Sequence, residues 1–246
     1  MISDRPPFSP TTTLGIAPDY IHLWLLDSDQ ITETELSSHI GVLDANERAK
    51  AERIKYNKKT YLASRILMRK ALAHYVKKPP QDIEFSRTET GKPFLINQLK
   101  PVYFNLSHSK NFVVLAVCNH AKAGVDIEGV RQRKFLDIAE LYFHPREFSQ
   151  LTACTESARG NLFFRLWTLK EALFKATGSG IANNLDKADF NFRDDKIIAE
   201  FSENLGLVAS DWQFFQYQIT AGFLCALAVN SAQNIIPKWF DGGYFF

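Results

Sequence analysis

The sequence predicts an α+β protein of two similar, pseudo-symmetric halves, each with short antiparallel strands packed against helices. Its 246 residues suffice for one large domain or two of about 120 residues. Helix-like and strand-like stretches alternate twice along the chain, and the strand candidates follow one another at hairpin spacing. We expect the halves at residues 1–120 and 121–246, joined near Asn119–Ala123. No sequence repeat relates them, so their similarity is expected from element order alone.

The first half begins with a proline-rich, extended stretch at residues 1–18, followed by a buried strand at Tyr20–Leu26. Residues 44–57 and 58–76 have a helical composition, and Pro79-Pro80 ends the second helix. In that helix, apolar residues recur every three or four positions and form one stripe: Tyr61, Leu62, Ile66, Met68, Leu72 and Val76. Short strands are expected next at Ile83–Phe85, Pro93–Ile96, Val102–Leu106 and Phe112–Cys118.

The second half opens with a strand at Gly124–Glu128 and a helical stretch near Phe135–Phe143. His144-Pro145 indicates another helix start, because proline is favoured in the first turn. The strongest helix is expected from about Asn161 to Thr177, with glycine capping at Gly178-Ser179-Gly180. The remaining strands are expected at Asp189–Phe192, Ile197–Phe201, Trp212–Ile219 and Phe223–Val229, before an aromatic tail at residues 239–246 that can pack back.

Composition narrows the class of protein. Lys plus Arg exceeds Asp plus Glu by 29 to 27, so the net charge of +2 argues against a general nucleic-acid binder. Cys118, Cys154 and Cys225 are too scattered for a disulfide framework or a zinc site and are expected to be core thiols. The N-terminus lacks a signal-peptide pattern, and no apolar stretch is long enough to span a membrane. A soluble, cytoplasmic protein is therefore expected.

Two carboxylates lie close together on the strand at Gly124–Glu128. Strand side chains alternate between faces, so Asp126 and Glu128 share one face, about 6–7 Å apart at Cα. Like charges at that distance repel unless a cation neutralises them, and Mg²⁺ favours one or two carboxylates plus phosphate oxygens. Taken alone, however, such a pair is more often a solvated strand edge.

A second cluster lies on the helix at 161–177. Trp167, Glu171 and Lys175 are four residues apart and form one stripe. An isolated Glu-to-Lys pair is usually an ordinary surface pair. Here most of the helix is apolar, which indicates burial, and buried charges are normally paired or bound to a metal. The cluster therefore favours a functional role.

Two further clusters lie in the first half. Ser107 and His108 follow a strand candidate, where a hydroxyl beside an imidazole can bind phosphate, although a plain strand-terminal turn is equally compatible. A nucleophilic Ser-His pair is disfavoured, because sequence neighbours rarely have the required geometry and no G-x-S-x-G elbow is present. Arg87 and Lys92 flank a tight turn at Thr90-Gly91-Lys92, which on its own is best explained as an exposed hairpin.

Taken in order, these clusters resemble the motifs of the 4′-phosphopantetheinyl transferases, specifically the long type that activates surfactin synthetase (Sfp type). The resemblance covers roughly Glu47 to Gly180 and includes E-R-x-x-x-x-R, G-K-P, F-N-x-S-H, G-x-D-x-E, W-x-x-K-E-x-x-x-K and a trailing G-x-G. Each motif alone is modest, whereas the ordered set is highly specific. The long type carries both halves in one chain and is expected to be a monomer; the short holo-carrier-synthase type forms trimers.

The resemblance implies that coenzyme A lies between the two halves and that Mg²⁺, with Mn²⁺ as an alternative, bridges its pyrophosphate. Matching positions make Asp126, Glu128 and Glu171 the metal ligands. Lys175 would bind the attacked phosphate and stabilise the departing 3′,5′-ADP. Glu171, directly or through a bound water, is the candidate base, so the expected catalytic residues are Asp126, Glu171 and Lys175.

The resemblance also assigns the nucleotide end of coenzyme A. Ser107 and His108 would bind it, including its 3′-phosphate, with Arg53, Arg87 and Lys92 adding positive charge. The chain between Arg53 and Arg65 varies in length among relatives, so Arg48 and Lys50 are alternatives to Arg53.

The second substrate implied is an apo acyl or peptidyl carrier protein, whose serine receives the phosphopantetheine group. Carrier domains present a helix with a commonly acidic surface. After Glu128 the chain has three cations, Arg131, Arg133 and Lys134, followed by Phe135-Leu136, a pattern suited to docking such a helix. An ordinary charged loop explains the same pattern equally well.

Two other functions remain open on the sequence. Clustered carboxylates beside a lysine also suit a Mg²⁺-dependent nuclease or phosphodiesterase, which the near-neutral charge disfavours. A non-catalytic coenzyme A-binding or carrier-docking module is disfavoured because Asp126, Glu171 and Lys175 are all present. The sequence does not distinguish carriers of fatty acid, polyketide, nonribosomal peptide or siderophore synthesis.

Overall fold

The computed structural model describes residues 15–119, 122–131, 135–180, 184–194 and 196–246. These residues form two compact units, one comprising Lys122–Asn234 and the other comprising residues 15–119 with Ile235–Phe246. We call them the 122–234 unit and the N-terminal unit. The last twelve residues, Ile235–Phe246, belong to the same unit as residues 15–119, whereas the sequence analysis grouped them with residues 121–234. The expected lead-in at 1–18 lies mostly outside the described residues.

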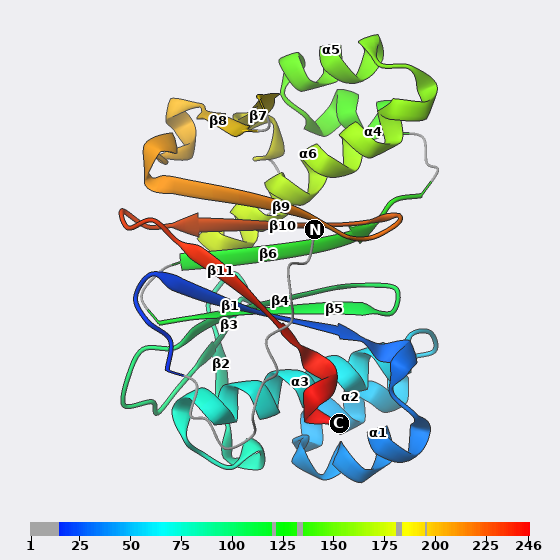
Figure 1. The fold of residues 1–246 in the computed structure, drawn as a ribbon, viewed down its shortest axis with the longest axis vertical. Helices are drawn as coiled ribbons and strands as arrows, with labels where there is room; N and C mark the ends of the chain where they lie inside the picture. Colours follow the sequence, from blue (N-terminus) through cyan, green and yellow to red (C-terminus); the bar gives the residue numbers. More distant parts are fainter. Residues whose placement is uncertain (1–14, 120–121, 132–134, 181–183, 195) are drawn as a thin grey trace. The chain divides into compact units, whose positions relative to one another are not determined.

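The N-terminal unit is built on a four-stranded sheet with the order β11-β1-β5-β4 (Figure 1). Its strands are β1 (Tyr20–Asp27), β4 (Tyr103–Ser109), β5 (Phe112–Cys118) and β11 (Ile236–Asp241). β5 pairs antiparallel with both β1 and β4, whereas β11 pairs parallel with β1, with Tyr20 opposite Ile236. This pairing explains why the C-terminal residues belong to this unit.

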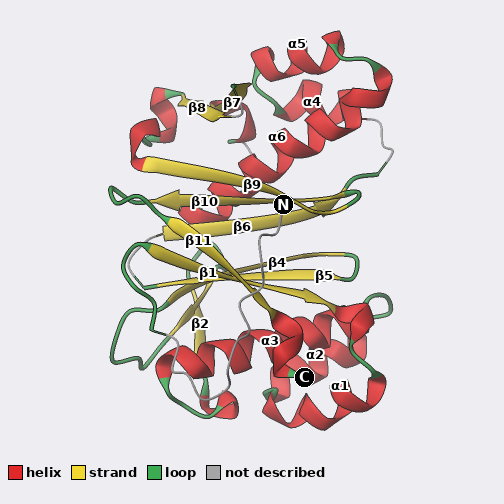
Figure 2. Ribbon diagram, viewed as in Figure 1, coloured by secondary structure: helices red, strands yellow, loops and turns green. Residues whose placement is uncertain are grey.

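Helices cover one face of that sheet (Figure 2). They are α1 (Glu33–His39), α2 (Ala45–Arg53) and α3 (Lys58–Val76), and a small hairpin of β2 (Phe85–Arg87) and β3 (Pro93–Leu95) follows. The apolar side of α3 packs against the sheet and contributes more residues to the core of the unit than any other element does. Trp24 of β1 belongs to this core and stacks on Phe240 of β11.

The 122–234 unit has a three-stranded antiparallel sheet with the order β6-β10-β9. Its strands are β6 (Lys122–Gly129), β9 (Trp212–Thr220) and β10 (Phe223–Asn230), and its helices are α4 (Phe135–Tyr142), α5 (Pro145–Ala153) and α6 (Glu156–Thr177). A separate hairpin consists of β7 (Ala188–Arg193) and β8 (Lys196–Phe201). Helix α6 packs along β6 and β10 (Figure 1).

Short 3₁₀ helices connect these elements. They lie at Ser28–Gln30, Ile40–Val42, Pro80–Asp82, Leu185–Lys187, Glu203–Leu205, Ala209–Asp211 and Gly242–Phe245. The α+β class is confirmed, since each unit combines a mainly antiparallel sheet with packed helices. Within the described residues, no helix has both the length and the apolar character needed to cross a membrane.

Local signals explain the ends of the helices. At the start of α5, the His144 side chain accepts from the backbone N–H of Arg146 and Glu147 accepts from the backbone N–H of His144, which forms a capping box. Helix α6 begins at Glu156, five residues earlier than the sequence predicted. It ends at Thr177 and is capped by Gly178, whose φ of 73° is left-handed.

Further differences from the sequence prediction concern β4, the C-terminal tail and helix α1. Strand β4 continues to Ser109, so Ser107 and His108 lie inside the strand. The strand-terminal turn that the sequence left open as an alternative does not form at these residues, because the β4–β5 connection lies further on, at Lys110-Asn111. The aromatic tail contains a strand, β11. Helix α1 was not predicted, although Thr32 and Glu35 form a capping box at its start. Among the cysteines, Cys118 and Cys225 are buried, as expected for core thiols, and Cys154 is partly exposed.

Candidate active site

Strand β6 and helix α6 approach each other unusually closely at Gly124. A Cβ atom on this residue would lie 2.1 Å from the carbonyl oxygen of Ala172 and 2.4 Å from the backbone nitrogen of Ala176. Gly124 therefore faces α6. Because strand side chains alternate, Asp126 and Glu128 occupy the same face of β6 and point to the same side of the sheet as α6.

Lys175 of α6 meets Asp126 on this face. Its Nζ lies 2.6 Å from Asp126 Oδ1, and Asp126 is only 3% exposed, so this carboxylate is not part of a solvated strand edge. Burial lowers the pKa of Lys175, but Asp126 and the neighbouring carboxylates raise it more, and the net pKa is raised. Lys175 thus stays charged and neutralises part of the site.

Glu171, one turn before Lys175, interacts electrostatically with the same charged groups. Burial, followed by the charge of Asp126, raises the pKa of Glu171 to about 7; Lys175 opposes this rise and Glu128 adds to it. Electrostatic coupling of this kind requires proximity, so one helix and one distant strand bring three carboxylates and a lysine together. The site carries more negative charge than its single lysine offsets.

These donors are not arranged as a ready-made metal cage. Across the described ranges, no group of three or more His, Cys, Asp or Glu side chains is placed to hold a metal ion. The Lys175 ammonium instead sits on Asp126, where it supplies the positive charge that the buried carboxylate requires. The chemistry of the donor set nevertheless fits a hard divalent cation, which binds carboxylate oxygens.

The other residues predicted for the site belong to the N-terminal unit. Ser107 and His108 lie on β4, the first buried and the second exposed. Arg87 is on β2, Lys92 directly precedes β3, and Arg53 is the exposed last residue of α2. The structure thus groups the four residues of the 122–234 unit and places these five in the other unit.

A cationic pocket of about 220 Å³ lies within the N-terminal unit. Lys50, Arg65 and Arg87 line it, and Lys50 Nζ and Arg65 Cζ lie 5.4 and 5.6 Å from the ring centroid of Tyr61. Burial lowers the pKa of Arg65, but an arginine remains charged. Lys50, an alternative to Arg53 on the sequence, lines this pocket, whereas Arg53 does not.

Sequence reasoning did not assign a role to Arg65. It is a cation within the apolar helix α3, and that contrast is the signal that could have singled it out. The same contrast applies to Arg69, one turn later, but its environment is different. Arg69 is buried and its charge is satisfied by the protein itself.

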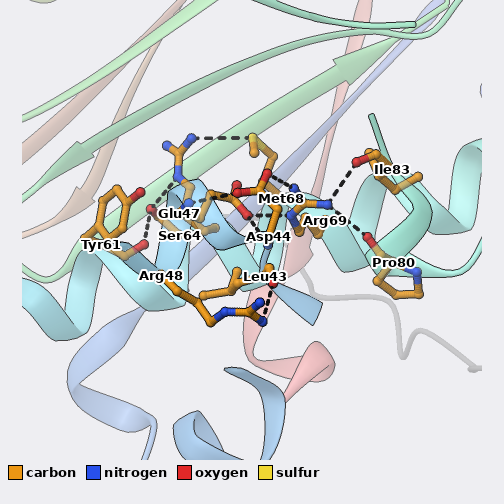
Figure 3. A network of polar contacts seen from close by, with 11 residues as sticks. Leu43, Asp44, Glu47, Arg48, Tyr61, Ser64, Met68, Arg69, Pro80 and Ile83 are labelled. Atoms are coloured by element: carbon orange, nitrogen blue, oxygen red, sulfur yellow. Dashed lines mark hydrogen bonds and ion pairs between the residues drawn. The ribbon is translucent and has the colours of Figure 1, made fainter. Parts of the chain in front are cut away.

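Arg69 fixes the wall of this pocket by joining α3 to α2 (Figure 3). Its Nη2 lies 2.6 Å from Asp44 Oδ2 and its Nε lies 2.6 Å from Glu47 Oε2, and its Nη1 donates to the carbonyls of Ile83 at 2.9 Å and Pro80 at 3.3 Å. Glu47 of the E-R-x-x-x-x-R segment is therefore a partner of Arg69, and it also lines the pocket.

Comparison with known proteins identifies the family to which this chain belongs. Residues 122–228 match the model of the 4′-phosphopantetheinyl transferase superfamily, and residues 30–120 match the 4′-phosphopantetheinyl transferase N-terminal model. The chain is 35% identical over 174 residues to the 4′-phosphopantetheinyl transferase HetI of Nostoc sp., covering 69% of this chain and 73% of that protein. It is 28% identical over 210 residues to the 4′-phosphopantetheinyl transferase Sfp of Bacillus subtilis, covering 85% and 90%.

Proposed function

Since the chain belongs to the 4′-phosphopantetheinyl transferase superfamily and is a transferase of phosphopantetheine to carrier proteins, we propose that its donor is coenzyme A and that its own carboxylates hold a divalent cation. The resemblance to the Sfp type that the sequence indicated is confirmed by these matches. The acceptor is the serine of an apo acyl or peptidyl carrier protein. The observation that carries the proposal is the convergence of Asp126, Glu128 and Glu171 beside Lys175.

We assign Mg²⁺ to Asp126, Glu128 and Glu171, with Mn²⁺ as the alternative. The fit is supported by the raised pKa of Glu171, which reflects buried, crowded carboxylates that lack sufficient positive charge. When bound, the cation would offset the charge of the pyrophosphate that the serine attacks.

The protein's own groups then have separate tasks. The serine Oγ forms a bond to phosphorus while the bond from phosphorus to the oxygen of 3′,5′-ADP breaks, and the leaving oxygen takes the electron pair. Lys175 holds the phosphate and stabilises the charge that develops on the leaving group. Glu171 accepts the serine proton, directly or through a bound water.

We propose separately that the N-terminal unit binds phosphate groups of the nucleotide. The support is the pocket lined by Lys50, Arg65 and Arg87, whose charges suit a phosphate. Lys92, Ser107, His108 and Arg53 keep the roles expected from the resemblance: Lys92 and Arg53 as cations near the nucleotide, Ser107 and His108 as contacts to its 3′-phosphate.

The experiment is to incubate apo carriers with coenzyme A and Mg²⁺ and to measure the mass gained on serine. Glu171→Gln should reduce turnover by about 10² to 10⁴-fold while coenzyme A binding stays measurable by calorimetry. Glu156→Gln is the matched control, because Glu156 is exposed at the start of the same helix. Near-normal turnover of Glu171→Gln would remove the assigned role of this residue.

We propose that the carrier docks after β6. Arg131 is exposed, and Arg133 and Lys134 lie outside the described residues. On α4, which follows, Leu141 is 73% exposed and adds an apolar contact to the cations. An acidic carrier helix with an apolar stripe fits a surface of this chemistry.

Two sets of variants test docking. Reversing the charges of Arg131, Arg133 and Lys134, or replacing Leu141 by serine, should raise KM for the carrier more than KM for coenzyme A. Val208→Ser is the control, since Val208 is another exposed apolar residue of the same unit, at 60%. Equal effects on both KM values would place docking elsewhere.

A further inference from the structure

Helix α6 contains a second lysine whose charge is completely enclosed. Lys170 and Glu147 have no exposed side-chain surface, and Lys170 Nζ lies 2.7 Å from Glu147 Oε2. The same Nζ donates to the backbone carbonyl of Leu185 at 2.6 Å and to that of Ala188. An ammonium has three N–H donors, so these three acceptors satisfy it in full.

The partner of Lys170 is also fixed. Glu147 Oε1 accepts from the backbone N–H of Phe190 at 2.8 Å, and Oε2 accepts from that of His144 at 3.0 Å. Burial raises the pKa of Glu147 and lowers that of Lys170, but each charge stabilises the other and both backbone contacts favour the carboxylate. The start of α5, the start of β7 and the middle of α6 are thereby tied to one ion pair.

The position of this ion pair on α6 gives it a consequence for the site. Lys170 directly precedes Glu171, so the two side chains leave the helix about 100° apart. One side of α6 rests against β6 at Gly124, where the backbones touch, and Lys170 anchors a different side. Two anchors on different sides fix the rotation of a helix about its axis as well as its distance from the sheet.

We propose that Lys170 and Glu147 are positioning residues for the transfer reaction, which set the rotation of α6 and so hold Glu171 and Lys175 against Asp126. This inference rests on the proposed function of those three residues. Neither Lys170 nor Glu147 touches the substrate-facing groups; they act through the helix. Their effect should therefore fall on kcat, with the KM values for coenzyme A and carrier changing less.

The size of the effect follows from the helix dimensions. With a side-chain radius of about 5–6 Å, a rotation of roughly 10° displaces a carboxylate by about 1 Å. A misplacement of 1 Å can reduce the rate about 100-fold. We expect a kcat lowered about 10- to 100-fold when the ion pair is lost.

The test must separate positioning from simple unfolding. Removing one partner leaves an uncompensated buried charge, whereas replacing both by neutral side chains of similar size is often tolerated. The main variant is therefore K170M/E147Q. Arg146→Ala is the matched control: Arg146 is also on α5, is 59% exposed, and pairs with Asp189 and Glu200.

Thermal melting, kcat and both KM values are measured for each variant. A K170M/E147Q protein that is folded at the assay temperature, with kcat lowered at least tenfold and KM changed less than threefold, supports the inference, provided Arg146→Ala keeps the parent kcat. A folded double variant with kcat within twofold of the parent overturns it. If the double variant does not fold, E147D decides by the same criteria, because it keeps the charge and shortens the side chain.

The variant Glu171→Gln, measured in parallel, distinguishes the two proposals. Loss of turnover in Glu171→Gln together with unchanged kcat in the folded K170M/E147Q variant refutes the positioning role alone. Unchanged turnover in Glu171→Gln refutes the site on which that role rests.

Discussion

Substitution of Gly124 by alanine should separate the two elements that carry the acidic residues. The new Cβ would lie 2.1 Å from the Ala172 carbonyl oxygen, and real Cβ contacts essentially never fall below 3.0 Å. The strand and helix must therefore move apart by about 0.9 Å, the difference between these distances. Both nearest atoms, on Ala172 and Ala176, belong to the backbone, so no side-chain rotation can relieve the contact.

This displacement has two measurable results. Overpacking of a core costs about 1–3 kcal/mol, which urea unfolding of Gly124→Ala should reveal. Glu171 and Lys175 move with α6 while Asp126 stays on β6, so kcat should fall by about 100-fold, as expected for a misplacement near 1 Å. The assay is the same mass gain on an apo carrier, at saturating coenzyme A.

Gly160→Ala is the control, because Gly160 also lies on α6 but its added Cβ would meet only a side chain, the ring of Phe135, at 3.3 Å. That variant should keep its kcat and gain up to about 1 kcal/mol from improved helix propensity. A Gly124→Ala protein with an unchanged free energy of unfolding and a kcat within threefold of the parent would refute the close contact as a determinant of the site.

Three further predictions concern the N-terminal unit. Arg65→Met should raise KM for coenzyme A about tenfold with little change in kcat, whereas Arg48→Ala, which removes an exposed cation of α2 that does not line the pocket, should leave KM unchanged. Burial and then a nearby lysine lower the pKa of His22 from 6.5 to about 4, so the unfolded chain binds its proton first and stability should fall by about 2 kcal/mol between pH 7 and pH 5. Urea melts of His22→Gln should lack that part of the slope; an unchanged slope contradicts it. Phe240→Ala should lower the melting temperature by several degrees and Tyr244→Ala, more exposed, by less, because Phe240 stacks on the core.

Much of the 122–234 unit could be predicted from local patterns. The two-residue period of a strand was sufficient to put Asp126 and Glu128 on one face, and both charges act on Glu171. The four-residue spacing of Glu171 and Lys175 was sufficient to place them on one side of a helix. These inferences succeed because each depends on the geometry of a single element.

The sequence predictions that were wrong concern strand pairing between distant parts of the chain or short polar segments. The pairing of Tyr20 with Ile236 joins the two ends of the chain, and no local pattern near residue 236 indicates a parallel partner. Ser107 and His108 have a turn-like composition, yet the sheet extends past them because each is paired with a valine of β5. Helix α1 is only seven residues long, too short for a clear apolar period, and Thr32 was its one strong signal.

The buried charges on α6 show why the sequence alone could not distinguish a lysine suited to chemistry from one suited to structural support. Both Lys170 and Lys175 are cations in an apolar context, and both pair with a carboxylate. Lys170 also bonds two backbone carbonyls and has no exposed surface, so an incoming anion would have to displace three fixed oxygens. Lys175 is partly exposed and holds Asp126, which a metal could take over, leaving the ammonium for a phosphate. A charge can respond to a ligand only when its present partner can be exchanged, and on α6 that condition favours Lys175 for chemistry and Lys170 for support.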